Sequence, residues 1–517
     1  MAIQSIALAR QDTSEEILLM TKALEERVKM IQYMVYDLSR FDWSAFWKDS
    51  ATGEVFSTKF YYYETSTSPK GEKMNASVGL TATPSTETVR GEDTFGDKNA
   101  FSYIECNFEC IENGIKHVTA IKGDSHFSRT GKVQVGIVTP PTYWAKEDHA
   151  DEGFYIIHFS DRKDHPEIDA EFIPTPWTVA PDGTELGYGV VTKYYAGLID
   201  GVPYSSSGLP ILNFVSYNSA RTYLDKLGTN YYGSGSERTA YLLCMLWIKY
   251  QTKNSQNIFQ GCVNYNIQVK VAEATEAQTY VVIPTSTANN LVIGSYVSIG
   301  DALENTNLDR GASYMRDIAD KVMILRTEAI DATGNSRVYL DTAPITCTET
   351  TYLSTMPWGS GSCDEVLGHD GYIANNGRCP FVLGGVEDMI GAYYISLNEI
   401  WNKEAGTVVS YYTRRNAAWS STAVGYEKIA TFDMVNTTDA WIGDIDVDLV
   451  TGVQWPRTYG SGDSVGVGDR HYKGGTGTGL REALQRGNLW DGSLVGLSYA
   501  DLWYGLSSAG WSSAVCV

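Results

Sequence analysis

A heptad pattern occupies the first forty residues. Across Glu15–Arg40, apolar residues recur every seven positions, and a second set fills the positions four further on. The first set is Ile17, Leu24, Ile31 and Leu38, and the second is Thr21, Val28 and Val35. Such a seam predicts a coiled coil over 1–42, and its β-branched residues favour three strands over two. We therefore expect a homotrimeric stalk; one amphipathic helix packed on its own domain is the alternative.

Short alternating runs replace the heptads after residue 42. Segments such as "EVFSTKFYYYET" and "KVQVGIVTPPTYW" alternate apolar and polar residues, and Gly, Pro and Asp turns separate them up to about residue 200. This period of two predicts a β-rich domain, a sandwich or a barrel, over 43–200. Between 201 and 270 helix and strand patterns mix. Ser216 opens a helical run that stops at Gly228, and "SERTAYLLCMLWIKYQT" predicts a largely buried helix.

Two further regions follow. Residues 271–350 contain two strand patterns, "TYVVIPTSTANNLVIGSYVSIGD" and "KVMILRTEAIDATGNSRVYLDTA", with a turn at Asp331–Ser336, and they predict a small β module. From 351 the chain is rich in Gly, Trp and Tyr. Its last stretch, "GNLWDGSLVGLSYADLWYGLSSAGWSSAVCV", sustains neither a helical nor a strand period. It nevertheless carries three Trp and two Tyr, which a disordered tail would hardly contain.

Composition and charge narrow the class of partner. The 517 residues include 49 Gly, 34 Tyr and 13 Trp, a mixture that suits short strands, turns and recognition surfaces. The net charge of −22 argues against nucleic acid or an anionic membrane as the partner. The longest apolar run, Tyr241–Ile248, is far shorter than the ~20 residues of a membrane span, and no signal-peptide pattern precedes residue 12. We therefore expect synthesis in a cytoplasm and no membrane insertion.

Catalytic motifs are weak. "GDSVG" (Gly462–Gly466) matches a nucleophile elbow but lacks the strand before it and the helix after it. "GGTGTG" (Gly474–Gly479) follows no apolar strand, so it does not predict a phosphate loop. The sequence therefore predicts no catalytic residue and no cofactor.

Metal and disulfide patterns are equally weak. Asp444, Asp446 and Asp448 share one strand face, which we interpret as a solvent-facing edge rather than a calcium site. Cys106 and Cys110 would also share a strand face, and we expect two buried thiols rather than a metal pair. The eight Cys are too scattered for a disulfide framework in a chain of this length. No metal is expected.

The last stretch has a composition of its own. Chemically unrelated residues stand in a frame of Gly, Ser and Ala, which is typical of a paratope when the frame fixes the backbone and the other residues point outward. The alternative is a loosely patterned pair of strands whose aromatic residues belong to the core.

The same stretch resembles a known family. "LREALQRGNLWDGSLVGLSYADLWYGLSSAGWSSAV" is similar to the variable region of proteins diversified by retroelements, whose repeat reads roughly "REFLSFGNLxxGSxAGLSYxxLxxxLSxAxWxxxA". The residues on the constant frame are Arg481, Glu482, Gly487, Asn488, Leu489, Gly492, Ser493, Gly496, Leu497, Ser498, Tyr499, Leu502, Leu506, Ser507, Ala509 and Trp511. "RTAYLLCMLWIKYQTKNSQNIFQGCVNYN" and "HVTAIKGDSHF" also resemble parts of such proteins from gut bacteriophages.

The resemblance implies a fold class and a binding site. The fold would be α+β and multidomain, in which 201–270 plus 351–517 form a C-type lectin-type domain of the formylglycine-generating-enzyme kind, with the 271–350 module inserted. The variable region would be 487–517. Nine residues on or beside freely varying positions would bind the ligand: Trp490, Asp491, Leu494, Asp501, Trp503, Tyr504, Ser508, Gly510 and Ser512. Adenine changes in an asparagine codon do not produce Trp, which leaves open whether Trp490 and Trp503 are variable or fixed.

The function implied is attachment. The protein would be a bacteriophage receptor-binding protein of a tail fibre or tail tip, made in the host cytoplasm and carried in the virion beside other tail proteins. It would bind a protein or glycan receptor on the bacterial surface, and it would not be an enzyme. One alternative is a formylglycine-generating-type or glycan-degrading tail enzyme, against which the missing Cys pair and the missing facing carboxylates argue. The other is a cellular surface adhesin, which would need an export signal.

Overall fold

The computed structural model describes residues 42–330, 334–404, 408–413, 421–433, 439–474 and 477–517. The predicted stalk, with its seam from Ile17 to Leu38, lies outside these residues. Part of the predicted turn at Asp331–Ser336 also lies outside them, and the strands on either side of it form a hairpin.

The predicted α+β fold class is wrong for the part of the chain that the structure describes, which is β-rich instead. The predicted coiled-coil helix lies outside that part, and the C-type lectin-type domain stays a prediction. In the described part of the chain, strands β1 to β31 form several sheets, and there are only four α-helices. None of these four is a long coiled-coil helix. The helices are α2 (Trp43–Ser50), α3 (Tyr217–Leu224), α4 (Ser236–Tyr250) and α5 (Thr285–Ala288). The aromatic and β-branched runs after residue 351 are separated by Gly and form strands, which is the structure such residues favour.

Two sheets form most of the region from 43 to 204. The first has the order β2-β1-β7-β6-β8, and the second has the order β4-β3-β5-β9. The strands of the first are β1 (Phe56–Tyr61), β2 (Glu72–Asn75), β6 (Tyr143–His149), β7 (Phe154–Ser160) and β8 (Ile173–Pro174). Those of the second are β3 (Ile104–Glu112), β4 (Ile115–Ile121), β5 (Gln134–Thr139) and β9 (Gly189–Thr192). Cys106 and Cys110 lie buried on β3 as free thiols, which confirms that prediction.

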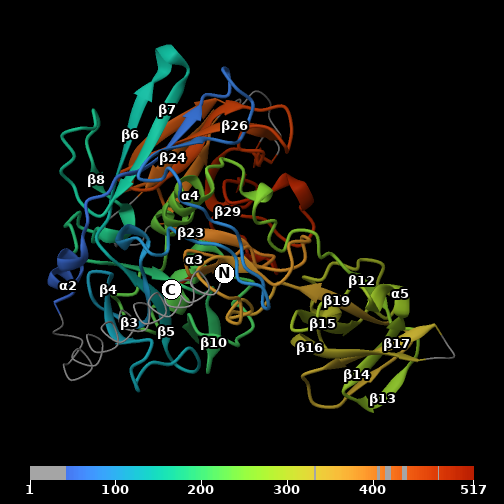
Figure 1. The fold of residues 1–517 in the computed structure, drawn as a ribbon. Coiled ribbons are helices and arrows are strands. Elements are labelled where there is room, and N and C mark those ends of the chain that lie inside the picture. The colour runs from blue at the N-terminus through green and yellow to red at the C-terminus, as the bar shows by residue number, and fades with distance from the viewer. Residues whose placement is uncertain (1–41, 331–333, 405–407, 414–420, 434–438, 475–476) are drawn as a thin grey trace, which may run out of the picture.

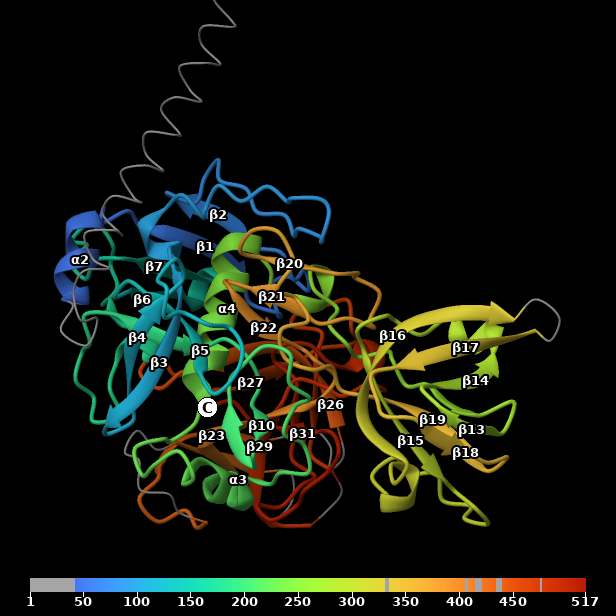
Figure 2. The ribbon, with the colours of Figure 1, turned by 90° about the horizontal axis from the view of Figure 1, so that it is seen from below.

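Helix α4 lies at the centre of the molecule (Figures 1 and 2), and it contacts β1, β7 and β9. Every residue of α4 except Glu237 is buried, so the predicted buried helix is confirmed. The helix predicted from Ser216 is α3, and the Ser216 side chain accepts a hydrogen bond from the Ser219 backbone amide at its N-terminus. One hydrophobic core runs from Trp43 to Val517, so the regions before and after residue 200 share their packing.

The chain after residue 371 forms a small sheet and a large one. The small sheet is β20 (Gly371–Tyr372), β21 (Phe381–Leu383) and β22 (Val386–Asp388). The large sheet has the order β25-β24-β23-β29-β30-β28-β26-β27, and β31 pairs with β23. Its strands are β23 (Tyr393–Lys403), β24 (Val408–Thr413), β25 (Glu427–Asp433), β26 (Asp439–Val447), β27 (Gln454–Tyr459), β28 (Arg470–Tyr472), β29 (Gly479–Gln485), β30 (Ala500–Asp501) and β31 (Ser513–Ala514).

Residues 268–356 form a lobe that stands beside the rest of the molecule in both views (Figures 1 and 2). Its main sheet has the order β12-β19-β15-β16-β17-β14, and β13 pairs with β18. The strands are β12 (Gln268–Lys270), β13 (Thr275–Gln278), β14 (Tyr280–Pro284), β15 (Tyr296–Asp301), β16 (Ala319–Ile330), β17 (Asn335–Leu340), β18 (Ile345–Cys347) and β19 (Thr351–Met356). The lobe has a hydrophobic core of its own, which includes Val281, Ile299 and Leu353.

The remaining hairpin is β10 (Gly197–Ile199) with β11 (Val202–Tyr204). Among the described residues, no helix has both the length and the apolar character that crossing a membrane requires.

Candidate binding surface

The candidate binding surface lies on the irregular segment that follows β29. The chain leaves β29 at Arg486, whose φ of 69° turns it out of the strand. Two short strands pair it with the large sheet again: β30 lies between β28 and β29, and β31 runs parallel to β23. The stretches between these two attachments are loops, which explains why the sequence shows no period.

Buried ion pairs fix the start of this segment. The Arg486 guanidinium donates from Nε to Asp388 Oδ1 (3.1 Å), and Asp388 also pairs with Arg238 of α4. All three side chains are fully buried. Burial alone would raise the pKa of Asp388, but the charges of Arg486 and Arg238 hold it below its usual value. Arg486 Nη1 donates to the carbonyl oxygen of Leu497 (2.8 Å), and this hydrogen bond closes the loop.

Most residues of the constant frame are buried. Leu489, Leu497 and Leu502 are fully buried, and Trp511 is 5% exposed. Two glycines allow the loop to pack closely. A Cβ on Gly487 would lie 2.2 Å from Val495 Cγ2, and one on Gly496 would lie 2.3 Å from Ser255 Oγ, so any larger residue would push the loop outward.

The nine predicted ligand-binding residues differ in exposure. Trp490 and Trp503 are 51% and 56% exposed, and no other Trp among the described residues is exposed. Five are half-buried: Asp491, Leu494, Tyr504, Ser508 and Gly510. Asp501 and Ser512 are buried, and they lie at β30 and next to β31, where the segment joins the sheet. Seven of the nine positions therefore reach solvent, while the other two belong to the attachments.

An aromatic ring packs against each of the two exposed indoles. The Trp503 ring stacks on Tyr472 of β28 at 6.3 Å between centroids, and the Trp490 ring meets Trp511 edge to face at 5.1 Å. Tyr393 of β23 stacks on Tyr499 at 6.2 Å. Sequence reasoning missed Tyr393 and Tyr472, because nothing in their local patterns marks them as neighbours of residues about 30 to 110 positions away.

Three carboxyl groups lie beneath and beside this surface. Burial raises the pKa of Asp491 to about 6 and that of Asp501 to about 7, and the Asp491 charge adds to the rise at Asp501. Both have partners: Asp501 Oδ1 accepts from the Trp503 backbone amide (2.7 Å), and Asp491 Oδ2 accepts from that of Asn488 (2.8 Å). Burial also raises the pKa of Glu482 to about 9.

Glu482 differs from the two aspartates in its hydrogen bonding. Neither of its carboxylate oxygens makes a hydrogen bond of ordinary geometry, and the backbone amide of Tyr217 offsets only part of the effect of burial. A buried polar group in this state costs stability when it is ionised.

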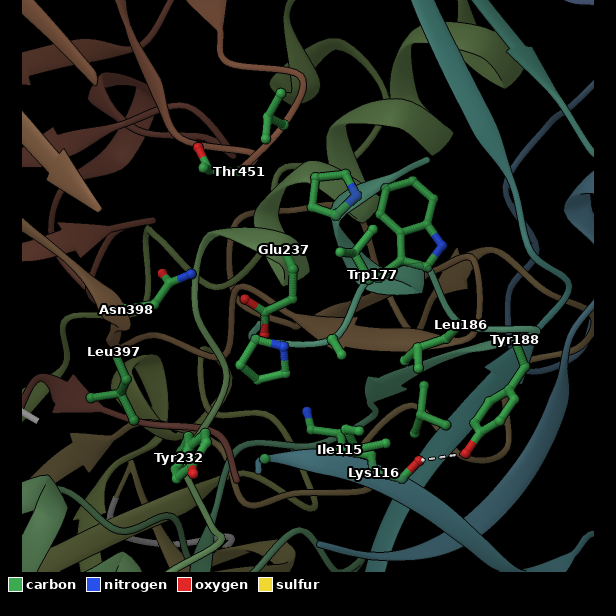
Figure 3. A pocket seen from close by; sticks show the side chains of 18 of the residues that line it. Ile115, Lys116, Trp177, Leu186, Tyr188, Tyr232, Glu237, Leu397, Asn398 and Thr451 are labelled. Atoms are coloured by element: carbon green, nitrogen blue, oxygen red, sulfur yellow. Dashed lines mark hydrogen bonds between the residues drawn. The ribbon is translucent and has the colours of Figure 1, made fainter. Parts of the chain in front are cut away.

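A second concavity lies between β4, α4 and the 176–188 segment (Figure 3). It has a volume of about 150 Å³, and Lys116 and Glu237 point toward it. Both charged groups already make hydrogen bonds within the fold. Lys116 Nζ donates to Thr192 Oγ1 (2.6 Å) and Ser234 Oγ (3.1 Å), and the Glu237 carboxylate accepts from the Gly235 backbone amide (2.8 Å). Burial lowers the pKa of Lys116. The pocket holds only a few atoms and presents no nucleophile with a paired base.

The acidic run at the end of β26 and just beyond it is not the solvent-facing edge predicted from its sequence. Asp444 is fully buried and forms an ion pair with Lys253, while Asp446 pairs with Lys146 at 3.1 Å. Asp448 Oδ2 accepts from the Thr451 backbone amide (3.0 Å) and closes a turn. In the described part of the chain, no group of three His, Cys, Asp or Glu side chains could hold a metal ion.

Comparison with models of known protein families gives no match, and none of the curated proteins matches the chain. The geometry of the C-terminal segment and its resemblance to a diversified variable region are therefore what bear on function.

Proposed function

We propose that the protein is a bacteriophage receptor-binding protein that attaches to the surface of a bacterium through the exposed side chains of 487–517. The observation that supports this most strongly is the contrast within that segment. Trp490 and Trp503 are more than half exposed, while frame residues such as Leu489 and Trp511 are buried. Exposed Trp and Tyr on a fixed backbone supply large contact area at low entropic cost, and Trp and Tyr are the commonest anchors of interfaces.

The anchoring of the segment supports the same proposal. Side chains on loops vary freely only when the loop does not depend on them, and here the backbone is held by Arg486, Gly487 and Gly496. Changes at Trp490, Trp503 or Tyr504 would therefore alter what is bound and leave the fold intact. The homotrimer, the other tail proteins and the virion location stay predictions from the sequence.

Attachment and stability measured on the same variants test the proposal. Labelled protein is incubated with a panel of bacteria, and the strains that retain it define the hosts. Trp503→Ala and Tyr504→Ala should reduce retention at least tenfold, since truncating an interface anchor costs about 2 kcal/mol or more. Trp511→Ala is the contrasting variant, because removing a packed Trp should lower the melting temperature by several degrees. If the first two variants unfold the protein and Trp511→Ala does not, the proposal is wrong.

The DNA beside the gene tests diversification separately. We expect a reverse-transcriptase gene and a near-copy of the last hundred or so bases of the coding sequence that differs from it at adenines. A neighbourhood without both would contradict a retroelement origin but not a role in attachment.

A further inference from the structure

A loop of the 268–356 lobe packs against the candidate binding surface. The guanidinium of Arg310 lies over the Trp511 ring (4.9 Å to the centroid) and the Trp490 ring (5.8 Å). At the next residue, a Cβ on Gly311 would lie 3.3 Å from Trp511 Cδ1. The loop that precedes these two residues, 303–309, therefore stands beside the exposed Trp490.

Hydrogen bonds to the lobe's own strands fix that loop. Arg310 is 4% exposed, and its Nη1 donates to the carbonyl oxygen of Thr355 on β19 (2.6 Å). Gln268 Nε2 of β12 donates to the carbonyl oxygen of Leu308 (2.8 Å). Asp309 accepts from the Gly311 backbone amide (2.8 Å). These hydrogen bonds therefore fix the conformation of the loop beside the Trp490 and Trp511 rings.

The combined surface is acidic. Glu304 and Asp309 are exposed on the loop, and the Asp309 charge acts on Tyr504, where it adds to burial and to the Asp501 and Asp491 charges in raising the pKa. In the C-terminal segment, the half-buried Asp491 and the buried Asp501 act on the same Tyr504 side chain.

Three cations of the described residues near this surface already have partners. Arg310 is buried in the contact just described, and Lys403 donates to the carbonyl oxygen of Gly474. Arg316 lies over the Phe214 ring (4.1 Å) and pairs with Asp320 (3.4 Å). The exposed charges of the 303–309 loop, Glu304 and Asp309, are negative.

We propose that the 303–309 loop and the exposed residues of 487–517 form one binding surface, and that its occupant is a protein segment with arginine or lysine side chains. This inference rests on the function proposed above and adds the chemistry of the partner. Exposed indoles bordered by carboxylates suit a cation that lies over a ring and pairs with an acid. Arg310 already makes the first of these contacts with Trp490 from inside the molecule. A surface without exposed indoles and carboxylates would offer a cation neither of these two contacts.

Peptide binding to the intact protein tests the proposal. The probes are an octapeptide of alternating arginine and serine, its counterpart with glutamate in place of arginine, and a neutral maltohexaose. Binding is followed by tryptophan fluorescence and calorimetry at pH 8. The variants are Trp490→Ala and Asp309→Asn. The matched control is Glu276→Gln, which changes the net charge by the same amount as Asp309→Asn. Glu276 is an exposed carboxylate on β13 of the same lobe.

We expect the arginine peptide to bind and the glutamate peptide and maltohexaose not to bind. Trp490→Ala should weaken binding of the arginine peptide at least fivefold and Asp309→Asn at least threefold, while Glu276→Gln leaves it unchanged. Equal weakening by Glu276→Gln would show that net charge alone attracts the peptide and would overturn the proposal. Binding of maltohexaose in place of the arginine peptide would also overturn it. If Trp503→Ala reduces retention on host bacteria and Asp309→Asn does not, the proposed function is supported and this inference is wrong.

Discussion

Arg486 Nη1 donates a hydrogen bond to the carbonyl oxygen of Leu497 at 2.8 Å, across a loop that carries Trp490, Asp491 and Leu494. The same guanidinium binds the buried carboxylate of Asp388, which α4 holds through Arg238. The loop that presents side chains to solvent is therefore tied to α4, which is buried except at Glu237, by charged groups that water does not reach. A rigid backbone beneath exposed side chains is what the proposed binding site requires.

Arg486→Met should destabilise the protein strongly. The substitution keeps most of the volume but leaves the Asp388 charge with one buried partner instead of two and frees the Leu497 carbonyl. Breaking a buried pair by removing one partner costs about 3–5 kcal/mol. Arg326→Met is the control, because Arg326 forms an exposed pair with Glu328, and such pairs contribute at most about 1 kcal/mol. Chemical denaturation of both variants measures the difference; similar free energies of unfolding would contradict the anchoring role.

Glu482→Gln should stabilise the protein more as the pH rises. The folded pKa of Glu482, about 9, lies above the value of an exposed glutamate, so the folded state holds a proton that the unfolded state has lost. The stability contributed by this group is full below the unfolded pKa and is lost as the pH rises through about 9. Gln cannot ionise and avoids that loss.

Melts at pH 5 and pH 9 measure this effect. The gain of Glu482→Gln over the unmodified protein should exceed about 1 kcal/mol at pH 9, the penalty of an unsatisfied buried group, and should be smaller at pH 5. The exposed Glu276→Gln should show no such trend. A gain that is the same at both pH values would mean that Glu482 does not titrate in this range.

Binding of the arginine peptide should weaken as the pH falls from 8 to 5. Asp501 and Asp491, with pKa values of about 7 and 6, lose their charges in this interval. The groups that face them are Tyr393 on β23, Lys403 at the end of β23, Glu482 on β29, and Tyr499 and Tyr504 of the same segment. Asp501→Asn should flatten the profile. A profile that is equally steep in Asp501→Asn would assign the pH dependence to other groups.

The eight cysteines should not react in the folded protein. All are buried and free, and burial raises the pKa of thiols such as Cys110, to about 11, so little thiolate forms. A thiol reagent should detect none of them at pH 8 in buffer and all eight in guanidinium chloride. Fast reaction in buffer would show that part of the core opens readily.

Local signals in the sequence predicted local structure. The N-cap Ser216 and the apolar run after Ser236 predicted α3 and α4, and the spacing of Cys106 and Cys110 predicted two buried thiols on a strand. The α+β fold class failed because strand pairing joins segments far apart in the chain. In the large sheet, β23 pairs with β29 about eighty residues later, and no local pattern records that contact.

The surface was predicted only in part for the same reason. Small frame residues around unrelated side chains marked 487–517, but they did not distinguish Trp503, which is exposed, from Asp501, which is buried in the sheet. Arg310 could not be predicted at all, because about 180 residues separate it from Trp490 and its own surroundings resemble an ordinary turn.

Retention on host bacteria by the double variant Trp490→Ala/Trp503→Ala tests attachment through 487–517 most directly. The comparison is made on strains that retain the unmodified protein, with a thermal melt of the same samples. The control is Val424→Ala, because Val424 is also a large exposed apolar residue but lies outside 487–517. The double variant should melt within a degree or two of the unmodified protein and lose at least tenfold in retention, while Val424→Ala loses nothing. Full retention by a folded double variant would contradict attachment through this segment.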